Sequence, residues 1–98
     1  MARAKYYVRL DTYWTFSQDV WYGPYSSKDE AEQAVNASCA VRDDLGNHAA
    51  NVRDDVRCYG IYTTTYARKE GMRVALTSKL PRNIEDWRGD LRLSDELR

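Results

Sequence analysis

The chain has 98 residues, of which 43% are hydrophobic and 31% are charged. A chain of this length builds one hydrophobic core, so we expect residues 1–98 to form a single domain. Its 15 basic and 15 acidic side chains cancel, which excludes a general electrostatic attraction to nucleic acid or to an anionic membrane.

The amino-terminal residues lead directly into an aromatic segment, without the apolar stretch that a signal peptide requires. No apolar run approaches the roughly 20 residues that cross a bilayer. We therefore expect a cytoplasmic protein that has no membrane contact. In that compartment Cys39 and Cys58 are expected to be reduced thiols in or near the core, although a disulfide between them stays open.

The first elements expected along the chain are two strands. Residues 5–16 alternate between apolar and polar side chains, as a strand with one drier face does. A polar turn follows, and residues 20–22 are again β-prone until Gly23 and Pro24 end them. The pattern predicts a hairpin.

A helix is expected next. Ser27 precedes Glu30 by three positions, which is the spacing of a capping box, so the helix should begin at Lys28. The helical spacing continues past Gly46 to Val56, so residues 28–56 form either one kinked helix or two. The core-facing stripe comprises Ala31, Ala34, Val35, Ser38, Val41 and Leu45.

The second half of the chain begins with its strongest strand pattern, residues 57–68. A turn at Gly71 leads to a further strand over residues 73–77, so we expect a second hairpin. Residues 82–98 form a short helix or a docked tail, and Asn83 is suited to cap such a helix.

This order of elements predicts an α+β fold. We expect a small two-layer sandwich in which an antiparallel sheet of about four strands, made of two hairpins, carries a helical segment on one face. The carboxyl-terminal tail or short helix completes the order β-β-α-β-β.

The chain offers little for catalysis or metal binding. Its single histidine, His48, and its two cysteines lack the short paired spacings of zinc sites. Motifs for an activated nucleophile and glycine-rich phosphate loops are missing from the sequence. We therefore expect a protein that is not an enzyme, with no cofactor and no metal.

The unusual part of the composition is aromatic, with eight tyrosines and three tryptophans. Tyrosine suits surfaces that a partner buries, because it combines an apolar ring with a polar tip. Since the helix covers one sheet face, we expect the other face to bind a partner protein. The residues proposed for this contact are Tyr7, Arg9, Tyr13, Tyr62, Tyr66 and Arg73.

Such a module would be a small inhibitor or adaptor. By its size and class alone, it could be a phage- or mobile-element-encoded antagonist of a host system, comparable with anti-CRISPR proteins.

Three alternatives stay open. The same face could bind single-stranded nucleic acid, with tyrosines stacked on bases and arginines on phosphates, although the zero net charge ranks this second. The tyrosines could instead pack in the sheet or in a homodimer interface. A basic partner could also bind an acidic surface formed by Asp43, Asp44, Asp54 and Asp55.

Overall fold

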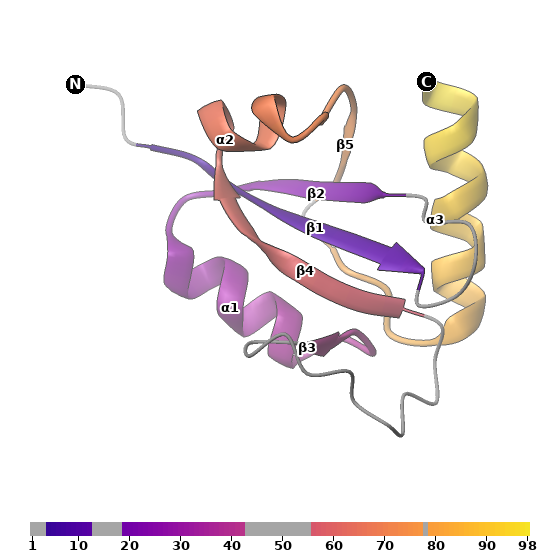
Figure 1. Cartoon of the computed structure of the whole chain (residues 1–98). Helices are drawn as coiled ribbons and strands as arrows, with labels where there is room; N and C mark the ends of the chain where they lie inside the picture. Colours follow the sequence, from indigo (N-terminus) through magenta and orange to yellow (C-terminus); the bar gives the residue numbers. More distant parts are fainter. Residues whose placement is uncertain (1–3, 13–18, 43–55, 78) are drawn as a thin grey trace.

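The computed structural model of the chain describes residues 4–12, 19–42, 56–77 and 79–98. These residues form a mixed sheet with the strand order β3-β4-β1-β2-β5, and helices accompany it (Figure 1). In chain order the elements are β1 (Tyr6–Thr12), β2 (Val20–Tyr25), α1 (Lys28–Asn36), β3 (Val41–Arg42), β4 (Val56–Thr63), α2 (Thr64–Lys69), β5 (Ala75–Leu76) and α3 (Ile84–Leu97).

The strand β1 lies in the middle of the sheet and runs antiparallel to both of its neighbours. It pairs with β2 on one side, which confirms the first hairpin. The strand β2 continues through Gly23 and Pro24 to Tyr25 instead of ending at Gly23. On the other side β1 pairs with β4, and the register shifts after Arg9 so that Tyr59 has no residue opposite it. This extra residue is a β-bulge.

The predicted second hairpin is wrong. The strand β4 ends at Thr63, where α2 begins, and β5 pairs in parallel with β2 at the far edge of the sheet. The strand ends there because β1 begins at Tyr6, which lies opposite Thr63. Beyond that pair, the Thr64 N–H donates to the Lys5 carbonyl at 3.2 Å, and a helix satisfies the following backbone groups. The sheet is therefore mixed rather than antiparallel.

The helix α1 begins at Lys28, as the capping pattern predicts. The Glu30 N–H donates to the Ser27 hydroxyl at 3.1 Å. The Glu30 carboxylate does not return to Ser27, however, but accepts hydrogen bonds from the backbone N–H and the hydroxyl of Ser26. The cap therefore involves both serines.

The helix α1 ends at Asn36, so the predicted long helix is wrong where the structure describes it. Ser38 donates its hydroxyl proton to the Val35 carbonyl at 2.6 Å, and a serine bonded in this way competes with continued helix. The Cys39 N–H then donates to the Pro81 carbonyl at 3.0 Å, and Val41 begins β3. The rest of the predicted helix, including Leu45 and Gly46, lies outside the described residues.

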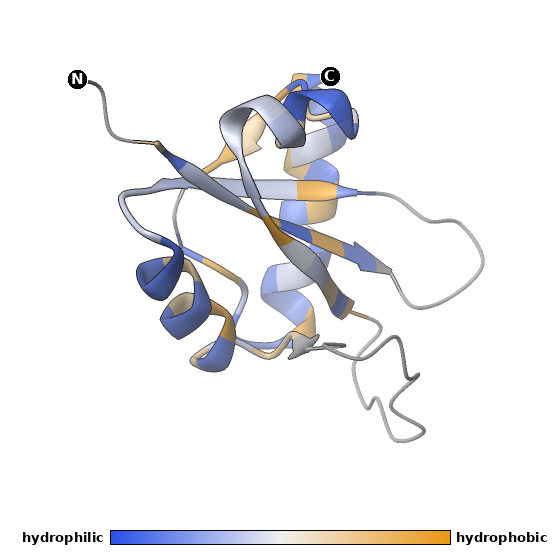
Figure 2. Cartoon of the chain, turned by 60° about the vertical axis from the view of Figure 1, so that its left-hand side comes forward, coloured by the Kyte–Doolittle hydropathy of each residue, from blue (hydrophilic) through white to orange (hydrophobic). Residues whose placement is uncertain are grey.

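Both longer helices pack on the same face of the sheet. Trp87 of α3 joins Ala31 and Val35 of α1 in one cluster with the buried strand residues. The helix α1 is otherwise largely hydrophilic, as Figure 2 shows. The predicted two-layer α+β class is thus confirmed. The core cluster comprises Val8, Leu10, Val20, Tyr22, Tyr25, Ala31, Val35, Val56, Cys58, Leu76 and Trp87.

The carboxyl-terminal segment is the helix that the sequence predicts. Asn83 caps it by accepting a hydrogen bond from the Asp86 N–H at 2.8 Å. Tyr22 of β2 donates its hydroxyl proton to Asp90 at 2.7 Å, which ties α3 to the sheet. No disulfide joins Cys39 and Cys58, of which the first is half-buried and the second buried. No helix in the described part of the chain is long and apolar enough to span a membrane.

Candidate interaction surface

The sheet face turned away from α1 and α3 carries aromatic and arginine side chains from its three central strands. Successive strand residues point to opposite faces. Because Val8 points into the core, its neighbours Tyr7 and Arg9 point to this face. The register then sets Tyr62 of β4 opposite Tyr7, and Trp21 of β2 opposite Arg9. Together with the bulged residue Tyr59 these residues form what we call the tyrosine–arginine face: Tyr7, Arg9, Trp21, Tyr59 and Tyr62.

Two glycines leave room for the tyrosine rings of this face. A Cβ atom at Gly23 would lie 2.7 Å from Cδ2 of Tyr7, and a Cβ atom at Gly60 would lie 3.3 Å from the ring of Tyr62. The ring of Tyr7 therefore lies close to the backbone of the neighbouring strand β2, and the ring of Tyr62 lies close to the backbone of its own strand β4. Tyr62 also contacts Trp21, with ring centroids 5.5 Å apart at an interplanar angle of 58°.

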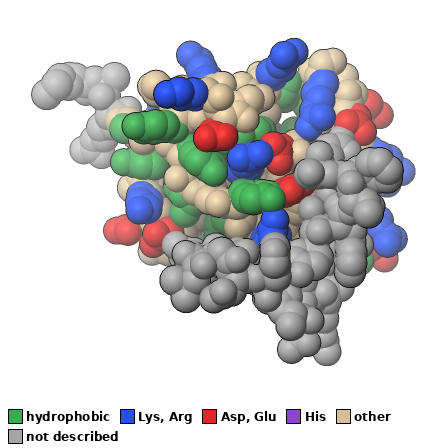
Figure 3. All heavy atoms as spheres, viewed as in Figure 1, with side chains coloured by type: hydrophobic (Ala, Val, Ile, Leu, Met, Phe, Trp, Pro, Cys, Tyr) green, Lys and Arg blue, Asp and Glu red, His purple; other side chains and the backbone are tan. Residues whose placement is uncertain are grey.

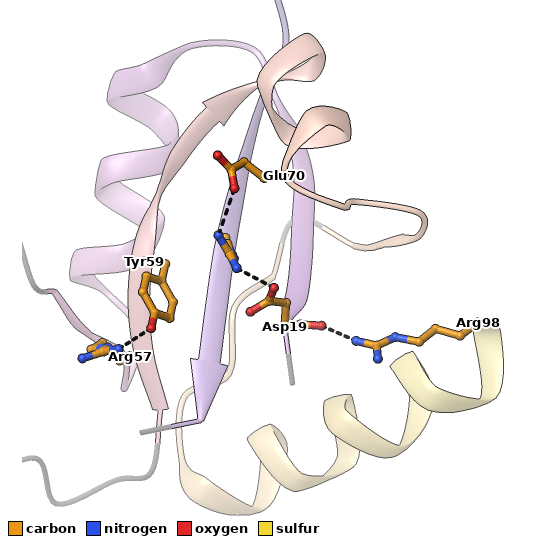
Figure 4. Close-up of polar contacts among 6 residues, drawn as sticks. Asp19, Arg57, Tyr59, Glu70 and Arg98 are labelled. Carbon is orange, nitrogen blue, oxygen red and sulfur yellow. Dashed lines mark hydrogen bonds and ion pairs between the residues drawn. The ribbon is translucent and has the colours of Figure 1, made fainter. Parts of the chain in front are cut away.

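Arg9 lies at the centre of the face. Its Nη2 contacts Oδ2 of Asp19 at 2.7 Å, and its Nη1 is 3.7 Å from Oε2 of Glu70 (Figure 4). Burial by itself lowers the pKa of Arg9, but the hydrogen bond and charge of Asp19, with a smaller effect of Tyr62, raise the pKa above its usual value. The guanidinium is therefore a permanently charged group that two carboxylates hold in place.

Tyr59 is contacted by two guanidinium groups. The Cζ atoms of Arg9 and Arg57 lie 4.9 and 4.5 Å from the centroid of its ring. Arg57 also donates from Nη2 to the Tyr59 hydroxyl at 2.6 Å, as Figure 4 shows. Although its orientation is fixed by these contacts, the residue remains 45% exposed. Such a residue is suited to an interface, because little side-chain entropy is lost when a partner covers it.

The structure brings together three of the residues that the sequence predicted for partner binding, namely Tyr7, Arg9 and Tyr62. The predicted position of Tyr66 on the sheet is wrong, since it lies on α2 and is 61% exposed. Arg73 is exposed in the connection between α2 and β5. Tyr13 and the four aspartates of the alternative acidic surface, Asp43, Asp44, Asp54 and Asp55, lie outside the described residues.

Sequence reasoning missed Trp21, Tyr59 and the two carboxylates that hold Arg9. The alternation of Val20, Trp21 and Tyr22 was sufficient to find Trp21. Tyr59 could not be found in this way, because simple alternation places it on the opposite face from Tyr62 and only the bulge brings both to one face.

A metal site has no support from the geometry of the described residues. In the described ranges no group of three or more His, Cys, Asp or Glu side chains is placed to hold a metal ion. Comparison with protein-family models, curated proteins and solved structures found no match for the chain. Any functional assignment therefore depends on the surface itself.

Proposed function

We propose that the chain is a protein-binding module and that the tyrosine–arginine face is its contact surface. The observation that carries the proposal is Tyr59, an exposed aromatic side chain whose ring contacts two arginines on the sheet face that the two longer helices leave uncovered. Tyrosine, tryptophan and arginine are the residue types that most often dominate binding energy at protein interfaces.

The charge pattern of this surface suits a protein partner. Hydrophobic, basic and acidic side chains intermingle over the strands on the side of the molecule that Figure 3 presents. Such a surface provides aromatic rings for burial and charged groups for specificity. A small module of this kind would act as an inhibitor or an adaptor by occupying the surface of another protein.

Single-stranded nucleic acid is the weaker candidate. Tyr7, Tyr59 and Tyr62 have faces on which bases could stack. However, the central cation Arg9 already contacts Asp19 and Glu70. A phosphate that bound to Arg9 would have to displace these carboxylates or approach them, and both cost electrostatic energy. This argument favours a protein.

The test compares Tyr59→Ala with Leu93→Ala. The two side chains are matched in exposure, at 45% and 44%, but Leu93 lies on α3, in the layer that covers the other side of the sheet. Tagged wild-type and variant proteins are used to capture partners from a lysate of the cells that encode the chain, with and without nuclease treatment. The captured protein is then purified, and its affinity is measured by calorimetry.

We expect Tyr59→Ala to weaken the purified complex by at least about tenfold, a cost near 1.4 kcal/mol, and Leu93→Ala to bind like the wild type. Equal affinity of the wild type and Tyr59→Ala would overturn the proposed surface. Recovery of nucleic acid that disappears on nuclease treatment would favour the stacking function, and recovery of a second copy alone would favour a homodimer.

A further inference from the structure

A pocket of about 610 Å³ lies beside the tyrosine–arginine face, where three parts of the chain meet. Its walls come from the start of β2, the connection between α2 and β5, and the last turn of α3. Sites for small molecules typically enclose about 300–1,000 Å³, so the pocket has a suitable size. Of the tyrosine–arginine face, Trp21 alone lines it, which makes the pocket a separate feature.

The charged groups of the pocket are unequally neutralised. Its two carboxylates, Asp19 and Glu70, both contact Arg9, at 2.7 and 3.7 Å. By contrast, Arg73 makes no ion pair or hydrogen bond with any residue that the structure describes. Arg98 donates from Nη2 to the uncharged backbone oxygen of Asp19 at 2.5 Å (Figure 4). Two guanidinium groups in one pocket thus lack a carboxylate partner among the described residues.

Apolar side chains stand beside these cations. Trp21, Val74 and Leu97 also line the pocket, and Leu97 is 50% exposed. A guanidinium group binds a carboxylate or a phosphate through two parallel hydrogen bonds. The combination therefore suits a ligand that carries an anionic group on an apolar body.

We propose that this pocket binds a small organic anion. Arg73 and Arg98 contact its carboxylate or phosphate, and Trp21 and Leu97 contact its apolar part. Neutral and cationic compounds of the same shape bind more weakly, because they leave both guanidinium groups without a partner. The site shares Trp21 with the proposed protein contact, but its two cations, Arg73 and Arg98, lie outside the tyrosine–arginine face.

The test uses phenylacetate and phenyl phosphate as probes, with phenylacetamide as the neutral control. Each is titrated into the isotope-labelled full chain, and binding is followed by amide and indole resonances in nitrogen–proton correlation spectra. Both anions should shift the resonances of residues 70–74 and the indole N–H of Trp21, with dissociation constants of about 1 mM or below. Phenylacetamide should bind at least about fivefold more weakly.

Matched variants locate the anionic contact. Arg73→Gln should weaken binding of phenylacetate about fivefold, since solvent moderates the strength of an exposed ion pair. Arg68→Gln removes a nearby exposed cation of α2 that does not line the pocket, and it should leave the affinity unchanged. Both side chains are exposed, so both variants are expected to fold.

Three results would overturn the proposal. These are equal affinities for phenylacetate and phenylacetamide, shifts confined to resonances outside the pocket, and binding of both anions weaker than about 10 mM. A peptide with a free carboxyl-terminal phenylalanine, compared with its amide, then identifies the source of the anion. Tighter binding of the free acid than of phenylacetate assigns a protein terminus, and weaker binding assigns a free small molecule.

Discussion

Arg9 and Tyr59 lie against each other across β1 and β4, with Cζ of Arg9 4.9 Å from the centroid of the Tyr59 ring. They are not partners in the strand ladder, because the register sets Arg9 opposite Gly60 and leaves Tyr59 as the extra residue of a bulge. The neighbouring residues Cys58 and Ile61 both pack into or against the core. The bulge thus supplies an aromatic side chain to the opposite face without moving a core residue.

Replacement of Tyr59 separates its two kinds of contact with the arginines. Tyr59→Phe loses the hydrogen bond from Arg57 but keeps a ring for both guanidinium groups, so we expect a loss of about 1 kcal/mol in the free energy of unfolding. Tyr59→Ala loses this hydrogen bond and both cation–π contacts, and it should cost about 2 kcal/mol. Urea denaturation measures both values. Equal costs for the two variants would show that the ring contacts contribute nothing.

The contact between Tyr22 and Asp90 predicts a change in acidity. Burial, together with the charge of Asp86, raises the pKa of Asp90 above its ordinary value, while the hydrogen bond from Tyr22 lowers it. Tyr22→Phe removes the opposing contribution, so the pKa of Asp90 should rise further. A titration followed by the side-chain carboxyl resonance measures this shift. An unchanged or lower pKa in the variant would mean that the hydrogen bond does not stabilise the carboxylate.

The raised pKa of Asp90 makes the free energy of unfolding depend on pH. Because the folded state raises the pKa of Asp90, protonation of this residue favours folding. Its contribution to stability is therefore fully present below the pKa of the unfolded chain and is lost as pH rises through the folded pKa. At neutral pH, Tyr22→Phe should cost about 1 kcal/mol, since a partly buried carboxylate loses its donor. The cost should shrink in acid.

The parts of the fold that the sequence predicted are those that local chemistry determines. The first hairpin, the start of α1 at Lys28 and the cap at Asn83 depend on residues within a few positions of each other. The second hairpin failed because the end of β4 depends on where β1 begins, some 60 residues earlier. No local pattern around Thr63 contains that information.

In the candidate site, too, the sequence predicted only what the local pattern determines. Alternation along β1 was enough to group Tyr7 with Arg9, and the tyrosine-rich strand supplied Tyr62. The carboxylates that hold Arg9 come from residues 10 and 61 positions away along the chain. Their role depends on how the start of β2 and the end of α2 approach β1, which only the tertiary structure specifies.

The start of α1 predicts a second, opposite dependence on pH. The hydroxyl and the backbone N–H of Ser26 lower the pKa of the Glu30 carboxyl group. Its contribution to stability is therefore present above the unfolded pKa and lost as pH falls through the folded pKa. Ser26→Ala should raise the pKa of Glu30 towards its ordinary value, as measured by titration of its carboxyl resonance. Ser38→Ala, at the other end of the helix, should leave that pKa unchanged.

Two glycines should respond to alanine in opposite directions. Gly23 has φ +147°, and an added Cβ would lie 2.7 Å from Cδ2 of Tyr7 and 2.9 Å from the Tyr6 carbonyl oxygen. Because a backbone atom cannot give way as a side chain can, Gly23→Ala should cost about 2 kcal/mol or more. Gly89 lies inside α3, and apart from its chain neighbours and the nearby backbone of the helix, an added Cβ would meet no atom within 4 Å. Gly89→Ala should stabilise the protein by about 0.5–1 kcal/mol, because alanine favours a helix interior.

Thermal and urea denaturation of the two variants test this contrast. A rise in midpoint for Gly89→Ala together with a fall for Gly23→Ala is the expected result. A neutral Gly23→Ala would mean that the ring of Tyr7 does not lie against β2. The tyrosine–arginine face would then lack the close approach that fixes Tyr7.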